Sequence, residues 1–191
     1  MIIDHYDSFV FNLARYVREW GYSAEVVRCD QITVAEVAAL APSHVILSPG
    51  PATPAEAGVS VALVQALGPH IPMLGVCLGH QVMGAAFGAE IVAAKRPLHG
   101  QAVALEHNGL GVFADLPQGI PVGRYHSLVV DSSTLPDCFR VDAVSEEGDV
   151  MAMTHRTLPL VGVQFHLESI LTPDGKTMLQ RFLQHRVFEN E

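Results

Sequence analysis

One cysteine stands in a pattern that favours nucleophilic chemistry. The apolar run Pro72-Met73-Leu74-Gly75-Val76 leads into Cys77-Leu78-Gly79 and then into sequence compatible with a helix. Gly-x-Cys-x-Gly between a buried strand and a helix is the pattern of a nucleophile elbow, a tight turn that carries the reactive residue. A helix N-terminus at Cys77 favours the thiolate, which is the reactive form. A buried structural cysteine is the alternative, and the two flanking glycines favour the nucleophile.

A histidine and a glutamate follow another apolar strand near the C-terminus. Leu160-Val161-Gly162-Val163-Gln164-Phe165 is typical of a buried strand, and it places His166 and Glu168 in the loop layer where open α/β sheets build sites. His166 can accept the thiol proton and return it to a leaving amine. Glu168 can bond to the other ring nitrogen and fix the tautomer. An exposed loop is the alternative for His-x-Glu alone. Together with the cysteine pattern it indicates a triad in the chain order Cys, His, Glu, unlike the order nucleophile, acid, His of α/β-hydrolases.

Such chemistry also needs donors for an oxyanion. The backbone N–H of Leu78 is one candidate, and the second is a backbone N–H of the loop Ser48-Pro49-Gly50-Pro51, which follows the apolar strand Val45 to Leu47. Gly50 lets the backbone approach a substrate oxygen closely. An ordinary Pro-Gly turn is the alternative for this loop.

Composition limits the class of protein. The chain has 191 residues, of which 49% are hydrophobic, and its formal net charge is −9 from 20 acidic and 11 basic residues. This length predicts a single domain over residues 1–191. Basic residues do not cluster, which argues against nucleic acid or a membrane as partner, and no apolar run is long enough to span a bilayer. Cys29, Cys77 and Cys138 are far apart in the sequence, so we expect neither a disulfide framework nor a metal site. We also expect the protein to work in a reducing cytoplasm.

Strands and helices alternate in the first half of the chain. This rhythm predicts an α/β fold with an open, mostly parallel, flavodoxin-like sheet, helices on both faces and a small antiparallel extension. The expected parallel strands are 2–3, 24–28, 45–47, 72–76 and 160–165, and the expected helices are one capped by Asp7 or Ser8 and reaching Trp20, then 33–40 and 55–67. The expected extension consists of 102–105, 139–144 and 150–154. A last helix is expected after Thr172 as N-cap, with Pro173 at its first position.

With these motifs in place, the chain resembles the class I (triad) glutamine amidotransferases over essentially its whole length. Within them it is similar to the glutaminase subunits of anthranilate synthase and aminodeoxychorismate synthase. Three segments carry the likeness: Asp4-His5-Tyr6-Asp7-Ser8-Phe9, Leu47-Ser48-Pro49-Gly50-Pro51 and Phe165-His166-Leu167-Glu168-Ser169-Ile170-Leu171-Thr172. The resemblance implies that Cys77 attacks the side-chain amide of glutamine, that His166 and Glu168 complete the triad, and that the Gly50 and Leu78 backbones hold the oxyanion.

The resemblance also implies a substrate pocket and a partner. Its substrate contacts are Gly50, Pro51, Ala52, Gln81, His126, Ser127 and Leu128. Ammonia would pass to a chorismate-binding synthase subunit (component I) that yields anthranilate for tryptophan, 4-amino-4-deoxychorismate for folate, or both. The resemblance implies no cofactor on this chain, and Mg²⁺ on the partner. From the residues alone, Arg124 or His126 is interpreted first as a surface charge.

The chain departs from the usual family pattern at three positions. Leu167 stands where proline is usual between the histidine and the glutamate, which loosens the φ restriction there. Ala52 stands where glycine is usual, at a cost of about 1 kcal/mol or more if that position requires a positive φ. His5 stands where asparagine is commoner. Met1 lies directly against the first strand, which leaves open whether a few residues precede it.

Three other functions fit parts of this pattern. A stand-alone Cys-His-Glu hydrolase of related fold needs neither the Gly50 loop nor Gln81 and would work at full rate alone. A glutaminase subunit of another amidotransferase is the second. A non-enzymatic regulatory or interaction module is the third, and the intact set of Cys77, His166 and Glu168 argues against it. The sequence alone does not separate the two chorismate products.

Overall fold

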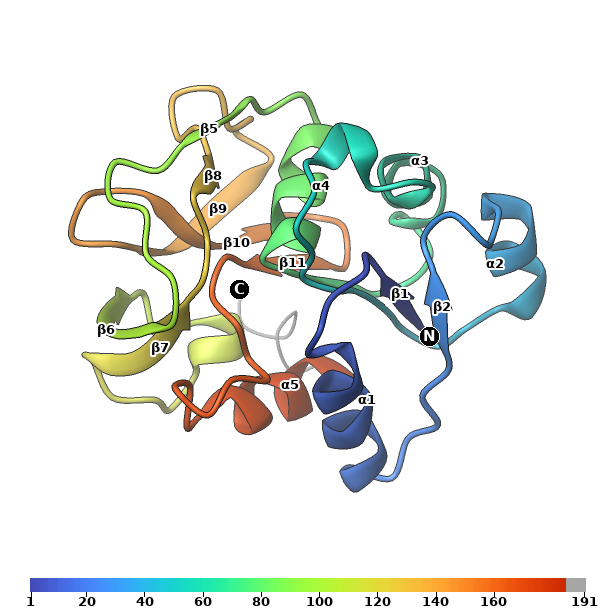
Figure 1. The fold of residues 1–191 in the computed structure, drawn as a ribbon, viewed down its shortest axis with the longest axis horizontal. Helices are drawn as coiled ribbons and strands as arrows, with labels where there is room; N and C mark the ends of the chain where they lie inside the picture. The colour runs from blue at the N-terminus through green and yellow to red at the C-terminus, as the bar shows by residue number, and fades with distance from the viewer. Residues whose placement is uncertain (185–191) are drawn as a thin grey trace.

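The computed structural model describes residues 1–184, in which a nine-stranded mixed sheet has the order β2-β1-β3-β4-β11-β10-β9-β6-β7 (Figure 1). Neighbouring strands of the first half are parallel: β2 (Val26–Arg28), β1 (Ile2–Asp4), β3 (Val45–Leu47), β4 (Met73–Val76) and β11 (Leu160–Val163). The second half is antiparallel: β10 (Val150–His155), β9 (Phe139–Val144), β6 (Gln101–His107) and β7 (Ile120–Arg124). The predicted α/β class is confirmed. The extension gains β7, whose Pro121 and Gly123 weaken its strand signal.

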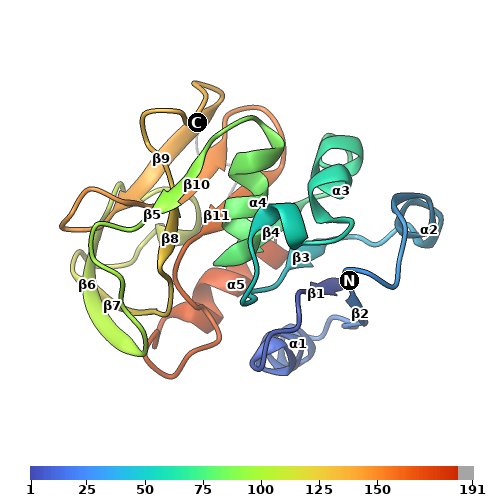
Figure 2. The same ribbon diagram turned by 45° about the horizontal axis from the view of Figure 1, so that its top comes forward.

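Helices cover both faces of the parallel strands (Figure 2). Alternate residues of a strand point to opposite faces, and the two hydrophobic clusters follow this period. Ile2, Ile46 and Leu74 pack with α1 (Val10–Glu19) and α5 (Gly175–Leu183). Ile3, Leu47 and Met73 pack with α2 (Val34–Leu40), α3 (Ser60–Leu67) and α4 (Leu78–Ala86). The smaller elements are the antiparallel pair β5 (Ile91–Ala93) and β8 (Leu128–Val130) and the 3-10 turns η1 (Pro54–Glu56) and η2 (Gly111–Phe113).

The helix expected over 33–40 is present as α2, whereas the caps expected at Asp7 or Ser8 and at Thr172 are wrong. Thr33 caps α2 in a capping box with Glu36. Neither Asp7 nor Ser8 caps α1, because the helix begins only at Val10, and the Asp7 carboxylate instead accepts a hydrogen bond from the Phe9 N–H at 3.0 Å. Thr172 does not cap α5, which begins at Gly175, because its side chain is used elsewhere, as described below.

The helix expected over 55–67 is divided into η1 and α3. Gly58 has φ +57, and a Cβ there would lie 2.4 Å from the carbonyl oxygen of Cys29. This close approach against the end of β2 requires glycine and interrupts the helix. Across residues 1–184, none of the helices combines the length and the apolar composition needed to cross a bilayer.

Candidate active site

Cys77 occupies the sharp turn between β4 and α4. Its backbone angles are φ 52 and ψ −102, a conformation that L-residues rarely adopt. The flanking glycines make the turn possible: a Cβ on Gly75 would lie 2.4 Å from the Gly79 oxygen, and one on Gly79 would lie 2.3 Å from the Leu47 oxygen. The elbow predicted from the glycine spacing is therefore present. Cys77 stands at the N-cap of α4, next to N–H groups that have no partner within the helix.

The strand next to β4 brings the histidine to this turn. β11 pairs with β4 so that Val163 lies opposite Val76, and the chain beyond β11 therefore passes Cys77. The His166 Nδ1 lies 2.5 Å from the Glu168 Oε1, and both side chains are buried. This hydrogen bond forms with Leu167 between the two residues, so the usual proline is not required for it.

The backbone of His166 is held from two sides. Its N–H donates to the Gly123 oxygen at 3.0 Å, and its carbonyl accepts from the Thr172 hydroxyl at 2.6 Å. The same hydroxyl accepts from the Gly123 N–H at 2.9 Å. Thr172 therefore fastens the histidine loop to the end of β7. The sequence predicted Thr172 as a helix cap. A cap and a bridge between two backbone segments both use a short hydroxyl side chain in a turn, so the residue type does not distinguish them.

The charges around His166 favour its protonated form. Burial alone lowers the pKa of His166, but hydrogen bonds with Cys77 and Glu168 and the negative charges of both outweigh burial and raise this pKa to about 10. Because Nδ1 bonds to Glu168, the other ring nitrogen is the one that can exchange a proton with Cys77 or a leaving group. The arrangement can stabilise a thiolate and deliver a proton beside it.

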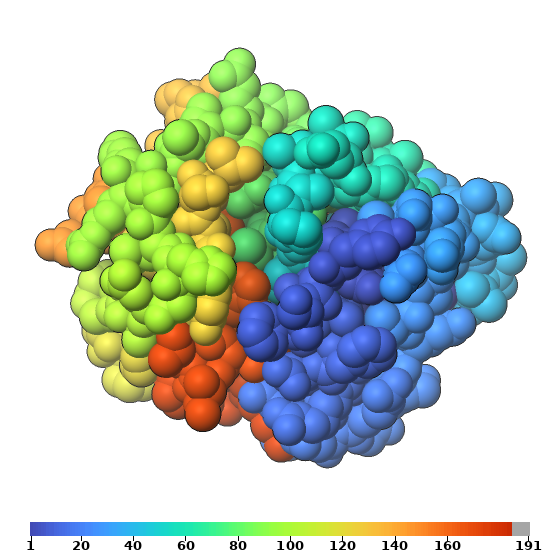
Figure 3. Space-filling model, in the orientation of Figure 1, coloured from blue at the N-terminus to red at the C-terminus, as the bar shows by residue number. Residues whose placement is uncertain are grey.

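A pocket lined by Cys77 opens at the elbow. It lies in the hollow that Figure 3 shows between the gold side chains that follow β7 and the cyan ones that follow β3. The pocket is lined by Cys77, by both predicted oxyanion residues and by all seven predicted substrate contacts, with Gly50 belonging to both sets. These residues are Gly50, Pro51, Ala52, Cys77, Leu78, Gln81, His126, Ser127 and Leu128. Tyr125 also lines it and was missed from the sequence. Its ring centroid lies 4.7 Å from that of His166.

The loop that carries Gly50 is anchored by His5. The His5 N–H donates to the Ser48 hydroxyl at 2.9 Å, and its ring nitrogens lie 2.8 Å from the Ser48 oxygen and 2.8 Å from the Ser60 hydroxyl. A Cβ on Gly50 would lie 2.6 Å from His5, so the loop packs without space for a side chain there. Ala52 is not among the non-glycine residues that adopt a positive φ within residues 1–184. Alanine therefore fits at position 52 without the backbone cost expected for a glycine site.

Gln164 is a further site residue that sequence reasoning missed. Its Nε2 lies 3.6 Å from the Cys77 sulfur, and its Oε1 accepts from Gln81 Nε2 at 3.1 Å. Gln81 Nε2 also donates to the Leu128 oxygen at 2.9 Å. The available signal was a fully buried amide interrupting an apolar strand just before His166. Gln81 thus supports the pocket wall as well as lining it.

Asp7 adds a negative charge beside the triad, and this leads to a prediction. Burial, aided by Glu168 and opposed by His166, raises the pKa of Asp7 from 3.8 to about 6. The native state therefore binds more protons than the unfolded state between those pH values, and stability falls as pH rises through this window. We expect Asp7→Asn, which keeps an acceptor for the Phe9 N–H, to raise the Tm by about 2–4 °C at pH 8, the equivalent of roughly 1 kcal/mol after solvent screening. The gain should shrink toward pH 4.5 in thermal unfolding experiments, and an unchanged Tm at pH 8 would contradict this assignment.

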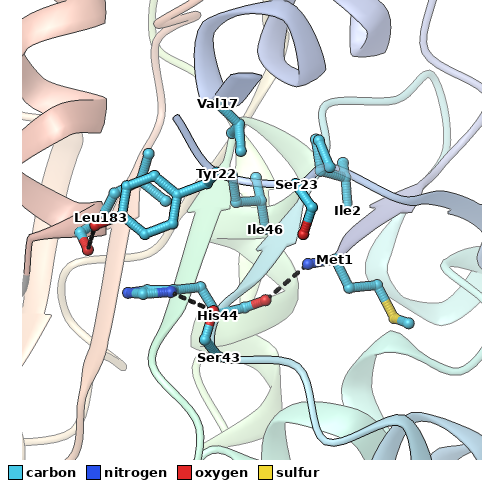
Figure 4. A pocket seen from close by; sticks show the side chains of 10 residues that line it. Met1, Ile2, Val17, Tyr22, Ser23, Ser43, His44, Ile46 and Leu183 are labelled. Carbon is cyan, nitrogen blue, oxygen red and sulfur yellow. Dashed lines mark hydrogen bonds between the residues drawn. The ribbon is translucent and has the colours of Figure 1, made fainter. Parts of the chain in front are cut away.

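Another pocket lies at the opposite end of the parallel strands, beside the amino ends of β1 and β3 (Figure 4). The Met1 ammonium donates to the His44 carbonyl at 2.9 Å, and the Tyr22 hydroxyl donates to the Leu183 carbonyl at 3.0 Å. No cysteine lines this pocket, and it is remote from the loops that follow the strands. Among the described residues, no group of three or more His, Cys, Asp or Glu side chains is arranged to hold a metal ion. The pocket at Cys77 is therefore the candidate site.

Residues 1–185 match the model of the family described as glutamine amidotransferase class-I. The chain belongs to this family. This amidotransferase is 48% identical over 187 residues to aminodeoxychorismate synthase component 2 of Serratia marcescens, covering 96% of this chain and 98% of the relative. It is 47% identical over 191 residues to anthranilate synthase component 2 of Pseudomonas aeruginosa, covering 97% and 95%. A solved structure described as a subunit of GMP synthase from Thermoplasma acidophilum superposes with a TM-score of 0.86 at 27% identity, covering 96% and 90%.

Proposed function

We propose that this amidotransferase hydrolyses L-glutamine to glutamate at Cys77 and passes the ammonia to a chorismate-binding synthase subunit. The observation that carries the proposal is the buried His166–Glu168 pair, whose histidine is hydrogen-bonded to Cys77, a strained elbow residue that lines the pocket. The two relatives named for different synthases are 48% and 47% identical to the chain. Identity therefore favours neither anthranilate nor 4-amino-4-deoxychorismate, and the partner subunit sets the product.

The residues support a two-step hydrolysis. The Cys77 sulfur attacks the side-chain amide carbon of glutamine, a C–S bond forms, and negative charge moves to the oxygen, which the N–H groups of Leu78 and Gly50 stabilise. His166 gives its proton to the amide nitrogen, the C–N bond breaks and ammonia leaves. A water then gives a proton to His166 and attacks the thioester, the C–S bond breaks, and glutamate leaves with the thiolate restored. The sum is glutamine plus water to glutamate plus ammonia.

The surface around the triad supports a protein partner. A second hollow next to the glutamine pocket is lined by Phe9, Asn12, Tyr125, His166, Glu168, Ser169 and Ile170. Ile170 is 92% exposed and Phe9 is 48% exposed. Two large apolar side chains beside the triad are therefore exposed to solvent. Tyr125 lines both hollows. A synthase subunit seated here would receive ammonia before bulk water converts it to ammonium, which is not a nucleophile.

Ile170→Asp tests this partner. We expect glutamine-dependent product formation with a chorismate-using synthase subunit to fall by at least about tenfold, because a buried unpaired charge weakens an interface, while ammonia-dependent synthesis stays unchanged. The matched control is Leu40→Asp, at the end of α2 and outside both hollows, where the leucine is 55% exposed. A stand-alone hydrolase would instead form glutamate at full rate without any synthase, and both variants would then match the wild type.

A further inference from the structure

Arg124, the last residue of β7, is a buried cation behind the glutamine pocket. It is 1% exposed and heads the fully buried side chains by volume. Its guanidinium lies 3.2 Å from the Glu147 carboxylate and 3.5 Å from that of Asp149, both in the turn between β9 and β10. It also donates to the Arg96 carbonyl at 3.3 Å. The sequence-based interpretation of Arg124 as a surface charge is wrong, and these partners offset the cost of burying it.

The Nε–H of this guanidinium determines the protonation of His126. Arg124 Nε lies 3.2 Å from His126 Nε2. A guanidinium only donates hydrogen bonds, so His126 Nε2 must accept and carries no proton. The ring proton is then on Nδ1, which lies 3.1 Å from the Leu128 carbonyl and donates to it. Burial first, and the Arg124 charge second, lower the pKa of His126 to about 4, so the ring is neutral at pH 7.

The Leu128 carbonyl links this histidine to the nucleophile. It accepts from His126 Nδ1 and from Gln81 Nε2, which fills both of its lone pairs. Gln81 Nε2 also donates to Gln164 Oε1, which turns the Gln164 N–H groups toward the Cys77 sulfur. His126, Leu128, Gln81 and Cys77 all line the pocket. A continuous set of hydrogen bonds thus joins the buried guanidinium to the pocket wall and the sulfur.

We propose that Arg124 is a positioning residue that holds His126 as the neutral Nδ1–H tautomer and thereby fixes the Leu128 carbonyl, Gln81 and Gln164 around the bound glutamine. As a statement about substrate binding, this rests on the proposed function. The tautomer is a property of the chain alone. With the other tautomer, Nε2–H would face the Arg124 N–H, two donors would meet, and the Leu128 carbonyl would lose its contact with the ring.

Nitrogen-15 NMR of the histidine rings tests the tautomer in the wild-type chain. We expect His126 to show a protonated Nδ1 and an unprotonated Nε2 at pH 7. In Arg124→Met the His126 ring signals should move to those of a mixture of tautomers. The KM for glutamine should rise about tenfold in the same variant. The rate of Cys77 alkylation by iodoacetamide, measured in parallel, reports the environment of the sulfur. An Nε2–H tautomer or an imidazolium in the wild type would overturn the proposal, and this measurement needs no folded variant.

Two variants of similar size separate positioning from packing. His126→Asn keeps an N–H near the Nδ1 position for the Leu128 carbonyl, whereas His126→Leu does not. We expect the KM for glutamine to be about tenfold higher in His126→Leu than in His126→Asn, and equal values would overturn the positioning role. A wild-type chain with the expected tautomer that hydrolyses no glutamine would contradict the proposed function and leave the tautomer assignment standing.

Discussion

Cys77→Ser is expected to abolish glutamine hydrolysis while ammonia-dependent synthesis by the partner subunit continues. The sulfur is the group beside which His166 and the α4 N-terminus are assembled, and a serine hydroxyl in this site has no comparable anionic form. The measurement is glutamate formation by the chain and product formation by the complex with each nitrogen source. The matched control is Cys138→Ser, outside the pocket, which should keep full activity.

The variant Cys77→Gly shows that the loss of glutamine hydrolysis in Cys77→Ser does not result from unfolding. Cys77 has φ 52, where glycine is free of the strain that a side chain meets. We therefore expect this variant to be inactive and yet more stable than the wild type by about 1 kcal/mol or more in chemical unfolding. Residual glutamine turnover near the wild-type rate in either variant would remove Cys77 from the mechanism.

His166→Asn is expected to lower kcat for glutamate formation by about 10²–10⁴-fold, the usual contribution of a general acid and base. Glu168→Gln should cost less, because an amide oxygen still accepts the Nδ1–H bond while the charge is lost. Single-turnover assays with glutamine compare both variants with the wild type. If Glu168→Gln proved more harmful than His166→Asn, the assigned roles would be wrong.

The same histidine makes stability depend on pH. The native pKa of His166 is raised to about 10 from its ordinary value of 6.5. Its contribution to stability is therefore fully present below pH 6.5 and is lost as pH rises through 10. The Tm difference between the wild type and His166→Asn should be largest at pH 6 and should shrink toward pH 10.

The nucleophile elbow could be predicted from the sequence because its requirement is local. Gly75 and Gly79 are needed where backbone atoms come within 2.4 Å and 2.3 Å of the places their Cβ atoms would take, and such contacts leave glycine as the one choice. The positions of Gly50 and His166 could also be predicted, because β3, β4 and β11 are short apolar runs whose ends carry the loops.

Residues that act through distant partners could not be predicted in this way. Arg124 is buried because Glu147 and Asp149 contact it from another hairpin. Thr172 does not cap α5 because its hydroxyl accepts a hydrogen bond from the Gly123 N–H of β7. Neither pairing leaves a local signal in the sequence, since each depends on strand neighbours that are far apart along the chain. Propensity alone therefore favoured a surface charge and a helix cap.

Covalent labelling tests whether Cys77 is the nucleophile that meets glutamine in this pocket. The probe is a glutamine analogue that carries an electrophilic diazoketone in place of the side-chain amide, followed by peptide mapping with mass spectrometry. We expect one adduct per chain on the peptide that contains Cys77, with labelling prevented by excess L-glutamine. A catalytically active chain that is labelled at Cys29 or Cys138 instead, or not at all, would contradict it.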